Sequence, residues 1–380
     1  MINFKRYTLD NGLTVLAHRD TFTPIAAINV LYKAGARNEQ ADKTGFAHLF
    51  EHLMFGGSVN IPSYDEPLQM AGGENNAFTN NDYTDYYISL PKDNIETALW
   101  LESDRMLGLD FSQKSLDIQK SVVIEEYMQN YLNRPYGDVW LNLRPLAYKQ
   151  HPYQWSTIGK SIEQIEHATL DEVKAFFYNY YAPNNAIIAV VADIDEDEIY
   201  TLVKKGFGDI PYRDVKQASI PKEPQKTEAR ELTLHRPVPV NAIFKAYHMC
   251  NRLHANYYIC DLLTDVLSSG KSSRLYRRLV QERQLFSQIN AYITGELDEG
   301  LIVVSGNILP HVDIKTAEES VNEELHKIAT ENISDYELEK IKNKVEAMQT
   351  FSETQGMNKA MNLCYYEMLG NTGLINSEIE

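Results

Sequence analysis

The same order of predicted elements, a strand followed by a helix that ends in a small-residue turn, occurs twice along this chain. In the first half, the apolar run at 26–35 predicts a central strand, and helical spacing follows at 43–56. In the second half, NAIFKAYHM predicts a strand, and the helical pattern at 255–269 ends at Gly270. A repeated order of elements is typical of a duplicated domain, so two similar halves are expected.

The length of the chain supports the same division. A chain of 380 residues exceeds what one hydrophobic core usually supports. The stretch at 211–230 is rich in Pro, Lys, Glu and Gln and lacks periodicity, which is typical of a linker. We therefore expect a first domain at 1–210, a linker at 211–230, and a second domain at 231–380 that begins with a strand at ELTLH.

The helix expected at 43–56 carries the run His48-Leu49-Phe50-Glu51-His52. Two histidines four residues apart lie on one face of a helix, so both imidazole rings can reach one cation. They lie beside the apolar stripe, so we expect them to be partly buried, and Glu51 can contact a metal-bound water without being a ligand. H-x-x-E-H is the reverse of a common zinc-peptidase motif, and the alternative is an ordinary helix that carries two histidines. The second copy, LLTDVLSSG, has neither histidine nor glutamate, so only the first half is expected to carry this chemistry.

A catalytic zinc site has three protein ligands and one open position, so a third ligand is required. The helical pattern VVIEEYMQNYL offers two glutamates, Glu125 and Glu126. Successive residues of a helix point about 100° apart, so only one of the two can face the metal. Helix geometry alone leaves the choice between them open.

The run GFAHLFEHLMFGGS, with Glu126 lying 74 residues after His52, resembles the pitrilysin–insulinase family of zinc peptidases. GGENNAFT, the Tyr-Tyr strand and GKSSRLYRRL extend this resemblance over nearly the whole chain. Within the family, the chain looks most like the mitochondrial-processing-peptidase branch and its bacterial relatives. The resemblance implies an α+β fold of two homologous domains, each a mostly antiparallel sheet flanked by helices. Two such chains would close as a clamshell around a chamber.

The resemblance also implies roles for the candidate site residues. One Zn²⁺ per chain would be held by His48, His52 and Glu126, with Glu125 as the fallback third ligand. Zinc lowers the pKa of its water and polarises the scissile carbonyl. Glu51 would accept the proton of that water as general base.

A second segment resembles the part of the family that holds the substrate. Glu74–Asn80 (ENNAFTN) is similar to an edge strand to which an extended peptide adds as a further strand. Asn76 and Ala77 would lie nearest the cleaved bond, with Phe78 beside them. The alternative is an Asn-rich turn, in which Phe78 belongs to the core.

We therefore expect a zinc-dependent endopeptidase that cleaves short or unfolded peptides. Family members that work alone or as identical pairs carry an arginine and, seven residues later, a tyrosine that together stabilise the oxyanion. The matching positions here are Val280 and Ser287, which favours a heterodimer in which a homologous subunit supplies the pair. A homodimer or a single-chain enzyme is the fallback. The alternative function is a catalytically inactive structural or core subunit, although such chains typically lose zinc ligands that this one keeps.

The remaining sequence properties restrict partners and location. The net charge of −17 argues against nucleic acid, and no stretch approaches the ~20 apolar residues of a membrane span. The first residues contain no apolar signal core, so a bacterial-like cytoplasmic location is expected, while export or organelle import after removal of a leader stays open. Three cysteines indicate apolar packing rather than a disulfide framework. The chain ends at INSEIE, short of the family's last helices, and both a truncated second domain and a natural end fit this.

Overall fold

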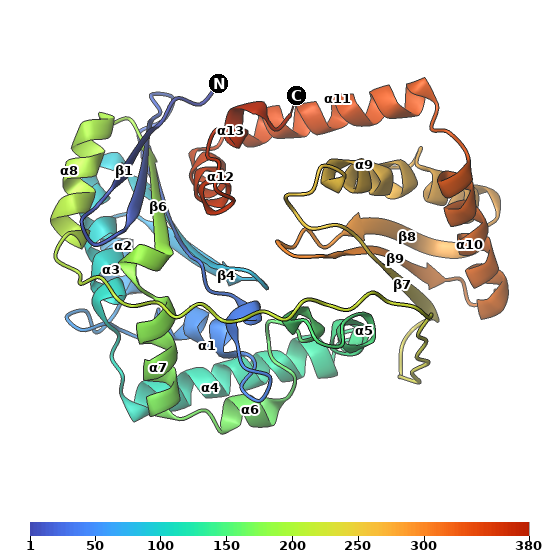
Figure 1. Cartoon of the computed structure of the whole chain (residues 1–380), viewed down its shortest axis with the longest axis horizontal. Coiled ribbons are helices and arrows are strands. Elements are labelled where there is room, and N and C mark those ends of the chain that lie inside the picture. The colour runs from blue at the N-terminus through green and yellow to red at the C-terminus, as the bar shows by residue number, and fades with distance from the viewer. Residues whose placement is uncertain (380) are drawn as a thin grey trace. The chain divides into compact units, whose positions relative to one another are not determined.

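The computed structural model describes residues 1–379, which fold into two compact units. Unit 1 consists of Met1–Asn133, Gln150–Lys222 and the residues from Thr350 onward. Unit 2 consists of Arg134–Lys149 and Glu223–Gln349. Each unit combines a β-sheet with helices, so the chain has the expected α+β class (Figure 1).

Unit 1 contains a six-stranded sheet in the order β1-β2-β6-β3-β5-β4. Its strands are β1 (Lys5–Thr8), β2 (Thr14–Arg19), β3 (Ile25–Tyr32), β4 (Glu74–Thr79), β5 (Thr84–Pro91) and β6 (Ala186–Ala192). β2 and β6 pair in parallel and the other neighbours pair antiparallel, so the sheet is mostly antiparallel as expected. Every residue of β6 is buried, because this apolar strand lies inside the sheet with both faces covered. β4 forms one edge.

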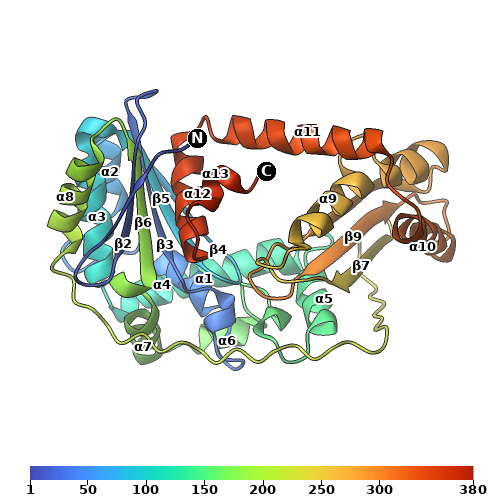
Figure 2. The ribbon, with the colours of Figure 1, turned by 45° about the horizontal axis from the view of Figure 1, so that its top comes forward.

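Helices cover both faces of this sheet (Figures 1 and 2). On one face, α1 (Phe46–Leu53) contacts β4 and β5, α3 (Ile95–Leu107) contacts β3 and β5, and α8 (Glu196–Phe207) contacts β2. α12 (Gly356–Met368) covers the opposite face at β3 and β6. The other helices of the unit are α2 (Asp65–Met70), α4 (Gln113–Tyr127), α6 (Ile162–Glu166), α7 (Leu170–Tyr180) and α13 (Leu374–Ser377). Of these, α4 and α7 contact α1, so α1 is enclosed between the sheet and two helices.

The helix α12 completes the core of unit 1. Ala360, Leu363 and Cys364 are buried against apolar side chains of β3 and β6. At the start of the helix, Lys359 donates to the Asp20 carboxylate across 2.6 Å, and both side chains are largely buried. A buried pair of this kind fixes the position of the helix, because separating it would leave a charge without a partner.

Unit 2 contains a three-stranded antiparallel sheet in the order β7-β9-β8. Its strands are β7 (Ala242–His248), β8 (Phe286–Ile293) and β9 (Leu301–Ile308). Its helices are α5 (Val139–Ala147), α9 (Tyr257–Ser268), α10 (Ile314–Thr330) and most of α11 (Asp335–Ser352). The order β7-α9-β8-β9 repeats the order β3-α1-β4-β5 of unit 1, apart from α2, as the sequence predicted.

Each unit contains one helix that comes from the opposite half of the sequence. α5 precedes β6 in the chain but packs on β7 in unit 2, whereas α12 follows β9 but packs on the sheet of unit 1. This partition differs from the linear division at 1–210 and 231–380. An amphipathic pattern shows that a helix has a buried face, but it does not show which sheet covers that face.

Three predicted elements differ in the structure. ELTLH lies in an irregular segment, with Leu232 and Leu234 exposed. The corresponding early strand of unit 1, β2, has a neighbour, because it pairs with β6. In unit 2, β7 pairs only with β9 among the described strands, so ELTLH has no strand beside it. The sequence at 273–284 has a helical pattern, and it forms largely the π-helix Tyr276–Glu282. The helical periodicity that runs through 334–370 predicts one long helix, which the structure divides into α11 and α12.

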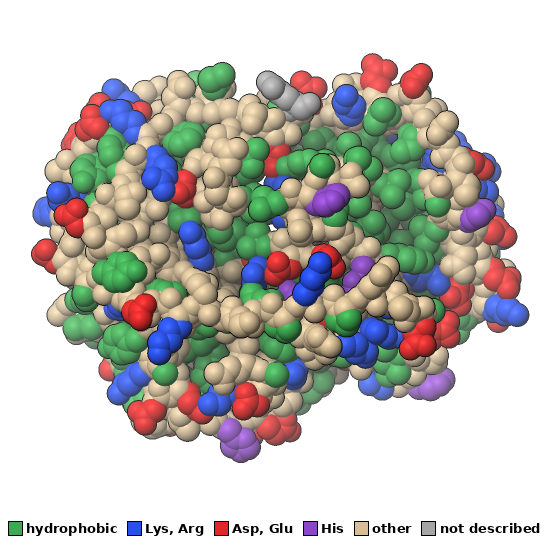
Figure 3. Space-filling model, viewed as in Figure 1, with side chains coloured by type: hydrophobic (Ala, Val, Ile, Leu, Met, Phe, Trp, Pro, Cys, Tyr) green, Lys and Arg blue, Asp and Glu red, His purple; other side chains and the backbone are tan. Residues whose placement is uncertain are grey.

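The surface of the molecule carries both signs of charge. Figure 3 shows Lys and Arg side chains scattered among Asp and Glu side chains on the face in view. Within residues 1–379, no helix is long and apolar enough to cross a membrane. All three cysteines are free thiols; Cys364 is a buried residue of α12, and Cys250 and Cys260 are half-buried.

Candidate metal centre

The helix α1 carries the H-x-x-E-H run and is anchored by its apolar face. Leu49, Phe50 and Leu53 are buried, and the Phe50 ring stacks on Tyr181 with ring centroids 5.1 Å apart. His48 and His52 lie beside this face with side chains 11% and 24% exposed, so the prediction of partial burial is confirmed. Both rings are therefore held by packing while one side stays accessible.

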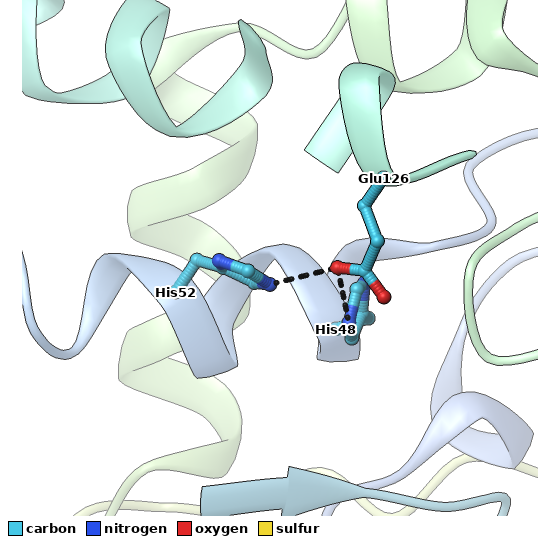
Figure 4. A group of neighbouring side chains, drawn as sticks. All are labelled: His48, His52 and Glu126. Carbon is cyan, nitrogen blue, oxygen red and sulfur yellow. Dashed lines mark ion pairs between the residues drawn. The ribbon is translucent and has the colours of Figure 1, made fainter. Parts of the chain in front are cut away.

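Three side chains converge where α1 meets α4 (Figure 4). The Glu126 Oε2 atom lies 3.6 Å from Nε2 of His48 and 3.4 Å from Nε2 of His52. One ligand atom from each residue falls within 4.8 Å of the other two. The histidines come from one helix and the carboxylate from another, so packing of α1 on α4 assembles the group.

The geometry of this group fits a zinc ion. Two ligands held by a tetrahedral zinc at about 2.0–2.1 Å are separated by about 3.3–3.4 Å. The Glu126 Oε2 atom lies 3.4 and 3.6 Å from the two Nε2 atoms, which is close to this separation. Two imidazoles and one carboxylate are also the donor set of known catalytic zinc sites. The Nδ1 atom of His48 is buried and has no hydrogen-bond partner among the described residues, so packing and the Nε2 contact set the orientation of this ring.

The protonation states of His48 and Glu126 suit metal binding. Burial lowers the pKa of His48 to about 4 despite the negative charge of Glu126, so its imidazole is neutral at neutral pH. The hydrogen bond with His52 lowers the pKa of Glu126, so its carboxylate is ionised. A neutral imidazole and an ionised carboxylate are the forms that bind a metal.

Glu51 lies on the same helix and is held at the edge of the sheet. Burial raises the pKa of Glu51, while hydrogen bonds from the hydroxyl and backbone N–H of Thr79 act in the opposite direction. Thr79 is the last residue of β4, so the end of this strand orients the Glu51 carboxylate. The sequence gave no signal for this role of Thr79, because the contact joins residues 28 positions apart.

Comparison with known proteins assigns the chain to a family. Residues 14–161 match the family described as Insulinase (Peptidase family M16), and residues 167–345 match the Peptidase M16 inactive domain. The chain is 32% identical to the zinc protease PqqE of Helicobacter pylori over 343 residues, which cover 88% of this chain and 77% of that protein. The chain belongs to the M16 insulinase family of zinc proteases.

Further M16 relatives agree in sequence and fold. The chain is 24% identical to the mitochondrial-processing peptidase subunit beta of Dictyostelium discoideum over 368 residues, which cover 93% of this chain and 76% of that protein. The crystal structure of a protease from Helicobacter pylori has a TM-score of 0.93 and 29% identity, covering 99% of this chain and 92% of that one. An M16 inactive-domain structure from Pseudomonas fluorescens has a TM-score of 0.88 at 18% identity, covering 99% of this chain and 90% of that one, and shows the shared fold alone.

The structure distinguishes the two glutamates between which helix geometry alone left the choice open, in favour of Glu126, as the resemblance implied. Glu126 points from α4 toward the two histidines (Figure 4). Glu125 is exposed and accepts a hydrogen bond from the Gln129 amide at 2.8 Å. Only Glu126 is therefore brought to the candidate metal centre.

The predicted substrate segment is the edge strand β4, not a turn. The backbone N–H of Ala77 donates to the Asn76 side chain at 2.8 Å instead of to β5. Because N–H directions alternate along a strand, the N–H of Thr79 points the same way, where Glu51 accepts it. Asn76 is exposed, whereas Phe78 is half-buried with its ring centroid 5.7 Å from that of Tyr83. The free edge of β4 thus lies beside Glu51.

Unit 2, most of which lies in the match to the M16 inactive domain, contains the positions expected for an oxyanion-binding pair. Val280 packs on the apolar core of this unit, and Ser287 donates to the Asn307 carbonyl at 3.3 Å. Arg283, which lies between the two positions in the sequence, forms an ion pair with Glu323 at 2.7 Å. Neither expected position carries a cationic or phenolic side chain.

Proposed function

We propose that this chain is a zinc-dependent endopeptidase that cleaves short or unfolded peptides. The observation that carries the proposal is the convergence of His48, His52 and Glu126 on one point, with Glu51 on the same helix as the histidines. Membership of a zinc protease family supports it. We assign His48, His52 and Glu126 as the ligands of one Zn²⁺ per chain.

Glu51 acts as the general base of this reaction. Zinc, when bound, supplies Lewis acidity that activates water and polarises the peptide carbonyl. Glu51 takes a proton from the attacking water and passes it to the departing amine. The raised pKa of Glu51 suits both steps, because a carboxylate with a higher proton affinity is a stronger base near neutral pH. The hydrogen bonds from Thr79 keep the carboxylate in place between the two transfers.

The free edge of β4 aligns the substrate. An extended peptide that pairs with this edge receives a hydrogen bond from the Ala77 N–H, which the Asn76 side chain otherwise occupies. Backbone pairing does not read side chains, so it suits a peptidase that accepts varied unfolded peptides. Asn76 would release the N–H when the substrate arrives.

The active enzyme contains a second, homologous chain. Stabilisation of the oxyanion requires a donor, and the positions expected to supply it here are Val280 and Ser287. A heterodimer in which the partner supplies an arginine and a tyrosine restores this function. Cleavage assays of the purified chain, alone and with any co-purifying homologue, test this part: full activity of the chain alone would refute it.

The substitution Glu51→Gln tests the proposed function itself. We expect the variant to retain about one zinc per chain and to lose at least about a hundredfold in kcat, because general-base catalysis is worth about 10²–10⁴-fold. The control is Glu66→Gln, which changes an exposed glutamate on α2 and should leave both properties unchanged. A Glu51→Gln variant that cleaves at the wild-type rate would refute the role of Glu51. Wild-type protein that binds no zinc would instead support a structural subunit.

A further inference from the structure

The helix that carries the metal motif begins at a residue that cannot cap it. The N-cap residue of α1 is Gly45, whose φ of +88° lies in the left-handed region that favours glycine. A Cβ atom at this position would lie 2.8 Å from the carbonyl oxygen of Ile158, so a larger residue does not fit. The Ser, Thr, Asp or Asn that usually satisfies the first N–H groups of a helix is therefore excluded.

A buried glutamate from outside the helix takes over this task. The Glu39 carboxylate accepts the N–H of Gly45 at 3.0 Å through Oε2 and the N–H of Ala47 at 2.8 Å through Oε1. Glu39 is 7% exposed, so water does not replace these bonds. A negative charge at this end of a helix also interacts favourably with the helix dipole.

The backbone that carries Glu39 is itself fixed to the rest of unit 1. The indole of Trp155 donates to the Ala36 carbonyl at 3.0 Å, and the Glu39 N–H donates to the same carbonyl at 3.2 Å. The hydroxyl of Tyr180 donates to the carbonyl of Asn38 at 3.1 Å. The carboxylate therefore has a defined position relative to Trp155 and to α7, and α1 begins where this carboxylate lies.

We propose that Glu39 is a positioning residue that sets where α1 begins and thereby brings His48 and His52 to Glu126. The third candidate ligand lies on α4, so the three ligand atoms come together only when α1 has the correct position along its own axis. A shift by one residue moves a side chain by about 1.5 Å along a helix and about 100° around it. Metal and catalytic sites tolerate only about 0.5 Å. Two N–H···O bonds to a fixed carboxylate restrict such a shift more strongly than apolar packing, which is not directional.

Zinc affinity of the substitution Glu39→Gln tests the proposal. The amide can accept one N–H, but its NH₂ group faces the other N–H, so the start of α1 is held less firmly. We expect the zinc affinity, measured by competition with a chromophoric chelator, to fall about 10-fold or more, as it does when other residues that orient metal ligands are replaced. The titration is run above the pKa of Glu39, which burial raises to about 8, so that the wild-type side chain is ionised. The spectrum of the Co²⁺-substituted protein should change as well, because it reports ligand geometry.

A matched variant separates positioning from a general loss of helix capping. Asp195 caps α8 by accepting the N–H of Asp197 at 3.0 Å, and α8 carries none of the candidate ligands. Asp195→Ala removes this cap and should lower thermal stability while leaving zinc affinity and the Co²⁺ spectrum unchanged. If Glu39→Gln yields no folded protein, Glu39→Asp provides the test, because the shorter side chain should draw back the start of α1 and weaken zinc binding.

The outcomes distinguish this proposal from the proposed function on which it rests. Folded Glu39→Gln or Glu39→Asp protein with wild-type zinc affinity and an unchanged Co²⁺ spectrum would overturn the positioning role alone. Wild-type protein without zinc affinity would overturn the metal site and, with it, this proposal. An equal loss of zinc affinity in Asp195→Ala would show that capping in general, not Glu39, supports the site.

Discussion

Replacing the third candidate ligand tests the metal centre most directly, because the chain offers a matched control one residue away. The substitution Glu126→Gln removes the carboxylate that lies 3.4 and 3.6 Å from the two Nε2 atoms. Glu125→Gln makes the same chemical change at an exposed position whose side chain contacts Gln129. Both variants remove one negative charge from the same turn of α4, so a general effect of charge would appear in both.

The expected loss can be estimated from the donor set. Zinc held by four protein ligands gains about 10–16 kcal/mol, so one ligand contributes about 2.5–4 kcal/mol. The Glu126 side chain is 33% exposed, which screens its charge and favours the lower end of this range. A loss of about 3 kcal/mol corresponds to about a hundredfold weaker binding, since each 1.4 kcal/mol is a factor of ten. For Glu125→Gln we expect a change of less than about twofold.

The assay is equilibrium competition with a chelator, combined with the metal content after gel filtration. Circular dichroism confirms that both variants are folded. Equal zinc affinity of Glu126→Gln and the wild type would refute the assignment of the third ligand. A loss in Glu125→Gln alone would show that α4 is rotated relative to α1 by about one residue.

Two further predictions concern the substrate edge and the second unit. The substitution Ala77→Pro removes an N–H that points away from β5, so we expect folded protein with normal zinc affinity and about 10-fold lower kcat/KM; unchanged kcat/KM would exclude strand addition here. In unit 2, hydrogen bonds from Arg274 at 2.8 and 3.0 Å lower the pKa of Glu337 from 4.5 to about 2. The resulting stability is present above pH 4.5 and is lost as pH falls to about 2, so Glu337→Gln should cost about 2 kcal/mol in urea unfolding at neutral pH and almost nothing at pH 2. If the difference in unfolding free energy between the wild type and Glu337→Gln stays constant from neutral pH to pH 2, the ion pair with Arg274 does not cause this stability.

Much of the fold could be predicted from local patterns. The apolar run at 26–35 located β3, and NAIFKAYHM located β7. The helical spacing located α1 and α9 within a few residues. The prediction of a strand at ELTLH was wrong for a physical reason. The backbone groups of a strand need hydrogen-bond partners on a neighbouring strand, and the described part of unit 2 provides no such strand beside this segment. The division between α11 and α12 was also missed, because helical periodicity continues across the break.

The candidate site was predictable to a different extent for each residue. His48, Glu51 and His52 follow from spacing on one helix, since the geometry of a helix is the same in every protein. Glu126 followed from a resemblance, and Glu39 and Thr79 were not predicted at all. Thr79 contacts Glu51 across 28 positions, and Glu39 contacts the start of α1 across 6 and 8 positions. Neither contact follows the regular period of a helix or a strand, so no local pattern encodes it.

By itself, the sequence determined that one helix presents two imidazoles and a carboxylate on one side, and that a second helix offers two glutamates. The tertiary structure alone decided that Glu126 and not Glu125 meets the histidines, that Thr79 holds Glu51, and that Glu39 holds the start of α1. It also decided that α5 and α12 pack on the sheet of the other half of the sequence. The physical reason is the range of the interactions: periodicity depends on neighbours within a few residues, whereas the metal centre depends on how separate elements pack.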